Sequence, residues 1–184
     1  MGLSQSDRNK LYVSPLQEEE TADLKKFKCS DKEFEQFLQR KSRKHEENLL
    51  AKTYLLYYKE KKEEKGEIVG FYTLSSASLS ATEELKLNFK SGKWYSDYPA
   101  VRIGRLAISK DYEGKGFGRH ILDYVKGQLV YYNEFIGCRY LIVNALNDVS
   151  EFYLKAGFSY YTEKDEKEKT RLMYFDLLSV LKEG

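Results

Sequence analysis

Hydrophobic positions in the first half of the chain follow the two-residue period of strands, interrupted by one stretch with helical spacing. The pattern predicts three strands, at Leu11–Leu16, Ala51–Tyr58 and Ile68–Leu79. The last two form an antiparallel pair across the charged turn Lys59–Gly66. A helix up to about His45 is predicted to begin at the capping box Ser30–Glu33, whose serine oxygen caps a backbone N–H.

The second half adds a helix between two hydrophobic strands and then a closing pair of strands. The expected elements are a strand at Val101–Ile108, a helix with Ile121, Leu122, Val125 and Leu129 on one side, a buried strand at Tyr140–Ala145, a short helix at Val149–Lys155, and strands at Phe158–Tyr161 and Leu172–Leu177 around a solvated turn, Thr162–Arg171. This order predicts an α/β protein, an α+β mixed sheet with a parallel βαβ crossover at its centre. We expect one domain over residues 1–184, with residues 1–10 flexible.

Composition narrows the class of protein only slightly. The 184 residues carry 31 Lys and Arg against 29 Asp and Glu, so a net charge of +2 does not by itself indicate a nucleic-acid partner. No stretch approaches the roughly 20 apolar residues of a membrane span, and the polar N-terminus lacks the apolar region of a signal peptide. Cys29 and Cys138 lack metal-ligand spacing and are interpreted as reduced thiols. We therefore expect a cytoplasmic protein without a membrane partner or a bound metal.

The candidate chemistry begins where the strand ending at Ile108 gives way to a turn and a helix. Gly114, Gly116 and Gly118 alternate with other residues directly before that helix. Glycines let a backbone approach a ligand closely and adopt φ > 0, and a helix start presents unpaired N–H groups and a positive dipole end. The segment is therefore typical of a pyrophosphate site, although a tight turn without a ligand has the same local signature.

Two other phosphate motifs are excluded. In a dinucleotide fingerprint that begins at Gly114, the third glycine position holds Arg119, and the P-loop pattern is absent.

A second motif follows, Phe152-Tyr153-Leu154-Lys155-Ala156-Gly157-Phe158, in which Gly157 suits a helix C-terminus. Together the two segments resemble the GNAT acetyltransferase superfamily, in which an Arg/Gln-x-x-Gly-x-Gly/Ala turn holds the CoA pyrophosphate and a tyrosine faces the thioester. The resemblance extends from about Phe27 to Leu177. Over this range the chain is similar to the branch that includes the GNAT toxins, which acetylate aminoacyl-tRNA. It rests further on the segments Phe27-x-Cys29, Ile68–Leu74, Gly104–Ile108 and Arg171–Asp176.

The resemblance implies a GNAT fold, a mostly antiparallel sheet with a parallel βαβ acetyl-CoA site flanked by helices. It implies that the cofactor is held by the strand end Leu106, Ala107 and Ile108, by the turn Glu113, Gly114, Lys115, Gly116, Phe117, Gly118 and Arg119, and by Asn147, Phe152 and Lys155. Glu113 departs from the family pattern, because it occupies the Arg/Gln position. We expect its carboxylate to turn away from the phosphates. Asn147 is one residue closer to the tyrosine than usual.

The implied reaction is attack by a neutral amine on the acetyl thioester. Tyr153 is the candidate general acid for the departing thiolate, and a backbone N–H near Ile108 is the candidate oxyanion donor. Tyr153 is also one of 16 tyrosines, so packing at a helix end is its alternative role. His45 and His120 are interpreted as surface residues, although His120 follows the turn closely enough to touch CoA, and no general base is identified.

We expect the acceptor to be selected by the first helix and by the segment Leu85–Ala100, which carries Trp94, Tyr95 and Tyr98. Five cations have two interpretations, a basic rim for an RNA backbone or scattered surface charge: Lys86, Lys90, Lys93, Arg102 and Arg105.

Three functions remain open at this point. The first is acetylation of an amine on a macromolecule such as aminoacyl-tRNA, which implies an antitoxin protein as a partner. The others are acetylation of a small molecule or a protein, and CoA binding without turnover. The related proteins suggest a homodimer by analogy alone.

Overall fold

The computed structural model of the protein describes residues 3–17, 21–61, 66–82, 85 and 95–182. Its strands follow the order β1-β2-β3-β4-β5-β7-β6 in a mostly antiparallel sheet with one parallel pair. The strands are β1 (Leu11–Pro15), β2 (Lys52–Tyr58), β3 (Glu67–Ser80), β4 (Asp97–Ile108), β5 (Tyr140–Leu146), β6 (Ser159–Tyr160) and β7 (Thr170–Asp176). The helices are α1 (Gln5–Arg8), α2 (Thr21–Leu24), α3 (Lys32–Arg40), α4 (Ser42–Glu47), α6 (Phe117–Tyr132), α7 (Ser150–Lys155) and α8 (Leu178–Lys182), with short 3-10 turns η2 (Lys110–Tyr112) and η3 (Asn147–Val149). The predicted mixed α/β class is confirmed.

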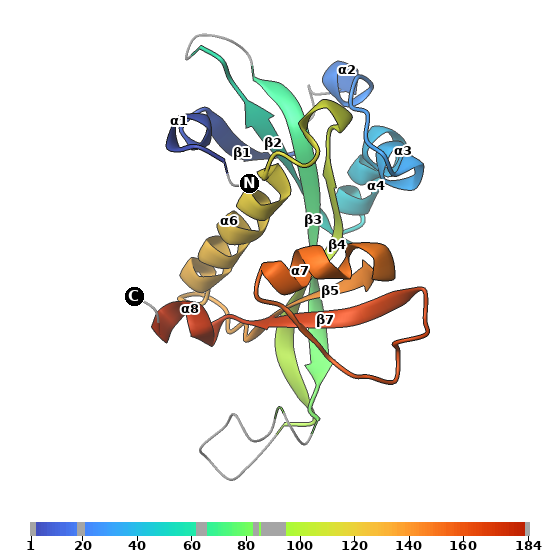
Figure 1. Ribbon diagram of the computed structural model, residues 1–184, viewed down its shortest axis with the longest axis vertical. Helices are drawn as coiled ribbons and strands as arrows, with labels where there is room; N and C mark the ends of the chain where they lie inside the picture. The colour runs from blue at the N-terminus through green and yellow to red at the C-terminus, as the bar shows by residue number, and fades with distance from the viewer. Residues whose placement is uncertain (1–2, 18–20, 62–65, 83–84, 86–94, 183–184) are drawn as a thin grey trace. The chain divides into compact units, whose positions relative to one another are not determined.

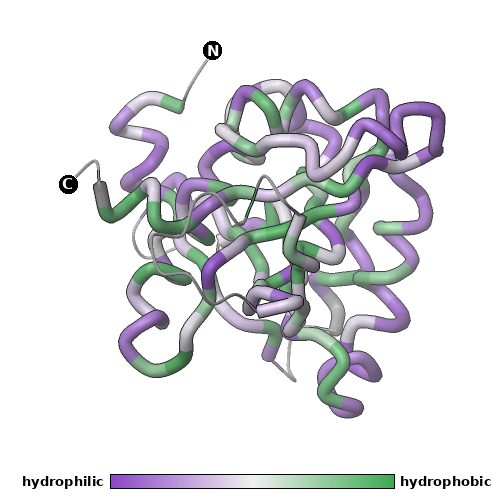
Figure 2. Tube along the Cα trace, turned by 90° about the horizontal axis from the view of Figure 1, so that it is seen from below, coloured by the Kyte–Doolittle hydropathy of each residue, from purple (hydrophilic) through white to green (hydrophobic). Residues whose placement is uncertain are grey.

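The chain forms two compact units, one of Met1–Ser75 with Ile103–Tyr124 and the other of Ser76–Arg102 with Val125–Gly184. Consecutive residues are buried along a central strand of each unit, at 68–73 of β3 and at 140–143 of β5. Figure 2 shows how hydrophobic and hydrophilic residues are distributed along the chain. Because successive side chains of a strand point to opposite faces, both strands bury residues on both faces of the sheet.

In the first unit, β1, β2 and β3 pair antiparallel, and Leu11 lies opposite Tyr58 while Leu55 lies opposite Phe71. The predicted antiparallel pair is therefore confirmed. Phe71 is fully buried and contacts Phe27 and Phe37 at ring-centroid distances of 5.5 and 6.4 Å. These aromatic contacts join α3 to the sheet and place the beginning of α3 beside η2, where the Lys110 N–H donates to the Lys28 carbonyl at 2.9 Å.

The beginning of α3 differs from the predicted capping box. Asp31, not Ser30, caps the helix, and its carboxylate accepts from the backbone N–H groups of Glu33 and Phe34 at 2.8 and 3.1 Å. Either side chain is a competent cap, but a carboxylate adds a favourable interaction with the positive end of the helix dipole. The predicted helix to His45 is also interrupted at Lys41, and a second helix, α4, follows.

In the second unit, β5 and β7 pair antiparallel, with Tyr140 opposite Asp176 and Leu146 opposite Thr170. The beginning of β4 joins them, because the Arg139 N–H donates to the Pro99 carbonyl at 2.9 Å. Helix α7 packs against β5 (Figure 1). Gly157 follows the end of this helix, and its φ of 84° is the left-handed conformation typical of a glycine at a helix C-terminus. The hydrophobic residues expected on one side of α6 are all buried: Ile121, Leu122, Val125 and Leu129.

The structure bears on three further expectations, which concern the N-terminal segment, the turn before β7 and membrane-spanning helices. Part of the segment 1–10, expected to be flexible, forms α1, which Ser4 caps through the Asp7 N–H. The expected solvated turn ends at a buried residue, Arg171, whose guanidinium binds Asp165 at 3.2 Å and the Thr162 carbonyl at 3.0 Å. Within the described ranges, no helix is both long enough and apolar enough to span a bilayer.

Candidate functional site

The end of β4, with Leu106, Ala107 and Ile108, lies against β3 at a point where a glycine is required. A Cβ atom on Gly70 would lie 3.0 Å from the Ala107 carbonyl oxygen and 2.8 Å from the Ile108 Cδ1. Just beyond, the Ser109 N–H donates to the Val69 carbonyl at 2.8 Å. The glycine of the Ile68–Leu74 segment therefore allows the close approach that sets the position of the strand end.

The glycine-rich turn adopts the conformation that the sequence predicts. Gly114 and Gly116 have φ values of 72° and 94°, which residues with a side chain rarely adopt. A Cβ on Gly114 would meet no atom within 4 Å, so the backbone there is open. The His120 N–H donates to the Gly116 carbonyl at 3.1 Å, and the amides of Phe117 and Gly118 precede it in the first turn of α6.

That first turn contains no acidic residue, so nothing in it opposes the positive end of the helix dipole. Amides before the first intrahelical hydrogen bond in general lack an acceptor within their own helix. The open glycine backbone, the amides and the dipole fit a diphosphate group.

Glu113, the departure from the family pattern, is held by a residue distant in the sequence. Its two carboxylate oxygens accept from the Ser30 N–H at 3.2 Å and from the Ser30 Oγ–H at 2.8 Å. The carboxylate is therefore bound to the segment that precedes α3, and that it turns away from the phosphates stays a prediction.

The cations near the turn have partners in the protein. The Lys115 ammonium donates to the Asp111 carbonyl at 2.6 Å and lies 5.3 Å from the Tyr112 ring centroid. The Arg119 Nε binds both carboxylate oxygens of Asp123, at 2.9 and 3.1 Å. Burial lowers the pKa of His120, and nearby Arg8 lowers it further, so this imidazole adds no charge at neutral pH.

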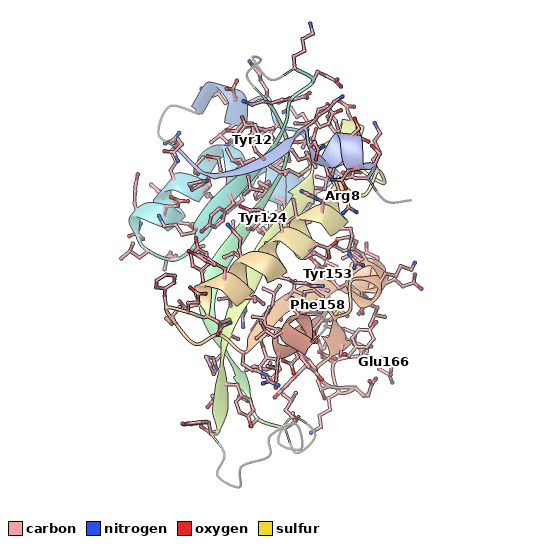
Figure 3. The ribbon with its side chains drawn as sticks, turned by 90° about the vertical axis from the view of Figure 1, so that its left-hand side faces the viewer. Arg8, Tyr12, Tyr124, Tyr153, Phe158 and Glu166 are labelled. Atoms are coloured by element: carbon pink, nitrogen blue, oxygen red, sulfur yellow. The ribbon has the colours of Figure 1, made fainter. Side chains whose placement is uncertain are left out.

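Tyr153, the candidate general acid, is a buried residue of α7 that lies among aromatic rings. Its ring centroid is 5.0 Å from that of Phe152 and 5.4 Å from that of Phe158, and Figure 3 shows Tyr153 and Phe158 side by side. Burial raises the pKa of Tyr153 to about 12. The phenol therefore stays protonated at neutral pH, as a proton donor must.

Three other candidate site residues, Asn147, Phe152 and Lys155, lie close to Tyr153 in the sequence and differ in their contacts. The Asn147 amide donates to the Glu168 carbonyl at 2.6 Å, which gives it a role in holding the loop before β7. Lys155 is exposed and pairs with Glu151 at 2.8 Å within the same helix. Phe152 is half-buried beside Tyr153.

The predicted site residues thus form two groups. Leu106–Ile108 and the turn 113–119 belong to the first compact unit, whereas Asn147, Phe152, Tyr153 and Lys155 belong to the second. That both groups serve one ligand stays a prediction.

Lys126 was not identified as a structurally important residue from the sequence. Lys126 of α6 is buried, its ammonium donates to the Ala156 carbonyl, and it lies 3.8 Å from the Phe175 ring centroid. A buried ammonium at the end of α7 stabilises that helix through its dipole and fixes the segment that carries Tyr153. The signal was present, because Lys126 follows Leu122 by four residues and so falls on the hydrophobic side of the helix.

The residues assigned to acceptor choice are only partly described. Trp94, Lys86, Lys90 and Lys93 lie outside the described residues. Tyr98 is buried against Tyr140, at 5.9 Å between ring centroids, and is therefore a core residue instead of a surface contact. Tyr95 is 76% exposed, and the Arg105 guanidinium stacks 3.8 Å from the Phe37 ring centroid of α3.

Comparison with known proteins shows the family to which the chain belongs. The family model described as Acetyltransferase (GNAT) domain matches residues 51–160, and the chain belongs to this family. A tRNA-acetylating toxin of Mycobacterium tuberculosis is 32% identical over 97 residues, which are 50% of this chain and 55% of the toxin. The chain thus spans about half the length of the curated relative that it matches.

Solved structures resemble the whole fold. A mutant of KacT superposes with a TM-score of 0.78 at 22% identity and covers 95% of this chain and 99% of KacT. AtaT complexed with acetyl-methionyl-tRNAfMet gives 0.76 at 22% identity, covering 92% and 96%. A mutant AtaT toxin bound to acetyl-CoA and the C-terminus of the antitoxin AtaR gives 0.72 at 22% identity, covering 93% and 96%. At these identities the likeness establishes the fold.

Proposed function

We propose that the protein is an N-acetyltransferase that transfers the acetyl group of acetyl-CoA to the amino group of an aminoacyl-tRNA. The observation that carries the proposal is the open, positive-φ turn at the start of α6, which fits the diphosphate of CoA in a member of the GNAT family. The acceptor is inferred from relatives: a curated relative is a tRNA-acetylating toxin, and AtaT binds acetyl-methionyl-tRNAfMet.

Each group of residues has a part in the proposed reaction. Acetyl-CoA supplies an acetyl group activated as a thioester. The amides of Gly114 to Arg119 bind its diphosphate, Leu106–Ile108 align its pantetheine arm along β4, and Phe152 and Lys155 flank it. A carbon–nitrogen bond to the amine forms as the carbon–sulfur bond breaks. The sulfur takes the proton of the Tyr153 phenol, and the proton released by the amine restores the phenol.

Partners and location follow from the same proposal. An aminoacyl-tRNA acetyltransferase would act in the cytoplasm, where charged tRNA is found. By analogy with AtaT, which binds the C-terminus of AtaR, we propose an antitoxin protein as a partner. Self-association into a homodimer stays a prediction from the related proteins.

Release of CoA in the presence of charged tRNA tests the proposal. We expect acetyl-CoA turnover with a pool of aminoacyl-tRNAs and none with uncharged tRNA. Turnover only with small amines or proteins would assign a different acceptor. CoA binding without turnover on any acceptor would leave a binding domain, and absence of CoA binding would remove the proposal.

Replacing Tyr153 by Phe tests the proton donor. We expect kcat to fall by about 10²–10⁴ with little change in CoA affinity, because the phenyl ring keeps its packing against Phe152 and Phe158. Tyr160→Phe, which removes a hydroxyl bonded to Ser150 at 3.1 Å, is the matched control. An unchanged kcat for Tyr153→Phe would exclude the role of general acid.

A further inference from the structure

The acidic residue in front of the diphosphate turn poses an electrostatic problem. Glu113 directly precedes Gly114 and is exposed, and a carboxylate at this point repels a bound diphosphate. A chain that binds CoA here must keep that negative charge from the ligand or compensate for it.

Ser30 offers both hydrogen-bond donors that the carboxylate needs. The backbone N–H binds one carboxylate oxygen and the hydroxyl binds the other, so both oxygens are engaged by one residue. Hydrogen bonds to an ionised group are stronger than those between neutral groups. The pair fixes the direction of a side chain that would otherwise be free to rotate on the surface.

The segment around Ser30 is itself held in place on both sides. The Cys29 thiol is buried and donates to the Asp31 carbonyl at 3.1 Å, and Asp31 itself caps α3. The Lys110 N–H donates to the Lys28 carbonyl at 2.9 Å, which ties the segment to η2 just ahead of the turn. Ser30 is therefore a fixed anchor for the carboxylate.

Resting on the proposed function, we infer that Ser30 is a positioning residue for CoA binding. Its N–H and hydroxyl hold the Glu113 carboxylate so that an acidic residue can stand in front of the diphosphate turn. The same contacts link the turn to the beginning of α3, a helix to which acceptor choice is assigned. Loss of the hydroxyl leaves the carboxylate bound by the backbone N–H alone, so the negative charge is freer to turn toward the diphosphate and weaken its binding.

A double-mutant cycle on CoA affinity, measured by isothermal titration calorimetry, tests this inference. We expect Ser30→Ala to weaken CoA binding about fivefold to tenfold when Glu113 is present, and less than about twofold in a Glu113→Gln background. Ser30→Thr, which keeps the hydroxyl, should restore most of the affinity. Ser78→Ala, on an exposed serine of β3, is the matched control, and thermal unfolding verifies that each variant is folded.

The outcomes separate the inference from the proposal on which it rests. An equal loss in both backgrounds, or none in either, would show that Ser30 does not act through the Glu113 charge. If the wild-type protein does not bind CoA at all, the proposed function fails and the positioning role fails with it.

Discussion

At the scale of single residues, burial sets the protonation states that the proposed reaction requires. The pKa of Tyr153 rises to about 12 because the charged phenolate is poorly solvated in its aromatic surroundings. Burial acts in the same way on the Cys29 thiol, whose pKa rises to about 11. Both groups are therefore neutral at physiological pH. A protonated Tyr153 suits its proposed role of general acid, whereas Cys29 is an unreactive core residue.

His120 gives a prediction for the pH dependence of stability. Burial lowers its pKa in the folded state, so the unfolded state binds more protons as the pH falls below the ordinary value of 6.5. The contribution of His120 to stability is therefore present above that value and is lost as the pH falls toward the folded-state pKa. We expect the free energy of unfolding to decline less steeply over this range in His120→Gln, measured by urea denaturation at several pH values. Parallel curves for the two proteins would contradict this assignment.

At the scale of elements, the two glycines near α7 and inside α6 have different structural roles. Gly157 ends α7 with a φ of 84°, and a Cβ there would lie 3.3 Å from the Phe175 Cε2. Gly127, inside α6, would have no atom within 4 Å of its Cβ. The first glycine is required by the fold, whereas the second only weakens its helix.

These two glycines form a matched pair of substitutions. We expect Gly157→Ala to destabilise the protein by about 1–2 kcal/mol, because it forces a side chain into the left-handed region and against Phe175. Gly127→Ala should stabilise it by about 0.5–1 kcal/mol, since alanine favours a helix interior. Chemical denaturation at neutral pH measures both changes. The same sign for both variants would show that local backbone conformation does not control stability at these positions.

At the scale of the whole molecule, positive and negative charges nearly balance, with 31 Lys and Arg against 29 Asp and Glu. Long-range attraction to the proposed tRNA acceptor is therefore weak, and its binding would depend on local cations and on stacking surfaces. Arg105, held against Phe37 of α3, is one described cation of this kind. In the proposed function, the cosubstrate is recognised instead by backbone amides, which carry no net charge.

Ligand binding should stabilise the folded protein as a whole. Acetyl-CoA at about a hundred times its Kd contributes about 2.7 kcal/mol, which for a chain of this size raises Tm by about 5–10 °C. Differential scanning fluorimetry measures the shift. Gly114→Val should lose it, because its side chain enters the open backbone at a φ of 72°. Gly137→Val, at another open glycine, should keep it. A full shift in both variants would place the diphosphate elsewhere.

Local sequence determined much of this protein. The strands, the position of α6 and the positive-φ glycines at Gly114, Gly116 and Gly157 follow from hydrophobic periodicity and glycine spacing, which act over a few neighbouring residues. The motifs also predicted the family that the comparison establishes. The roles of the site residues stay predictions.

Only the tertiary structure decided how residues far apart in the chain are paired. Ser30 binds Glu113 across 83 positions and leaves the cap of α3 to Asp31. Tyr98 is buried in the core, Asn147 holds a loop, and Lys126 is buried beneath the end of α7. The same residue type can be exposed in one place and buried in another. Whether a given residue is buried depends on the element that packs against it, and the neighbouring sequence does not contain that information.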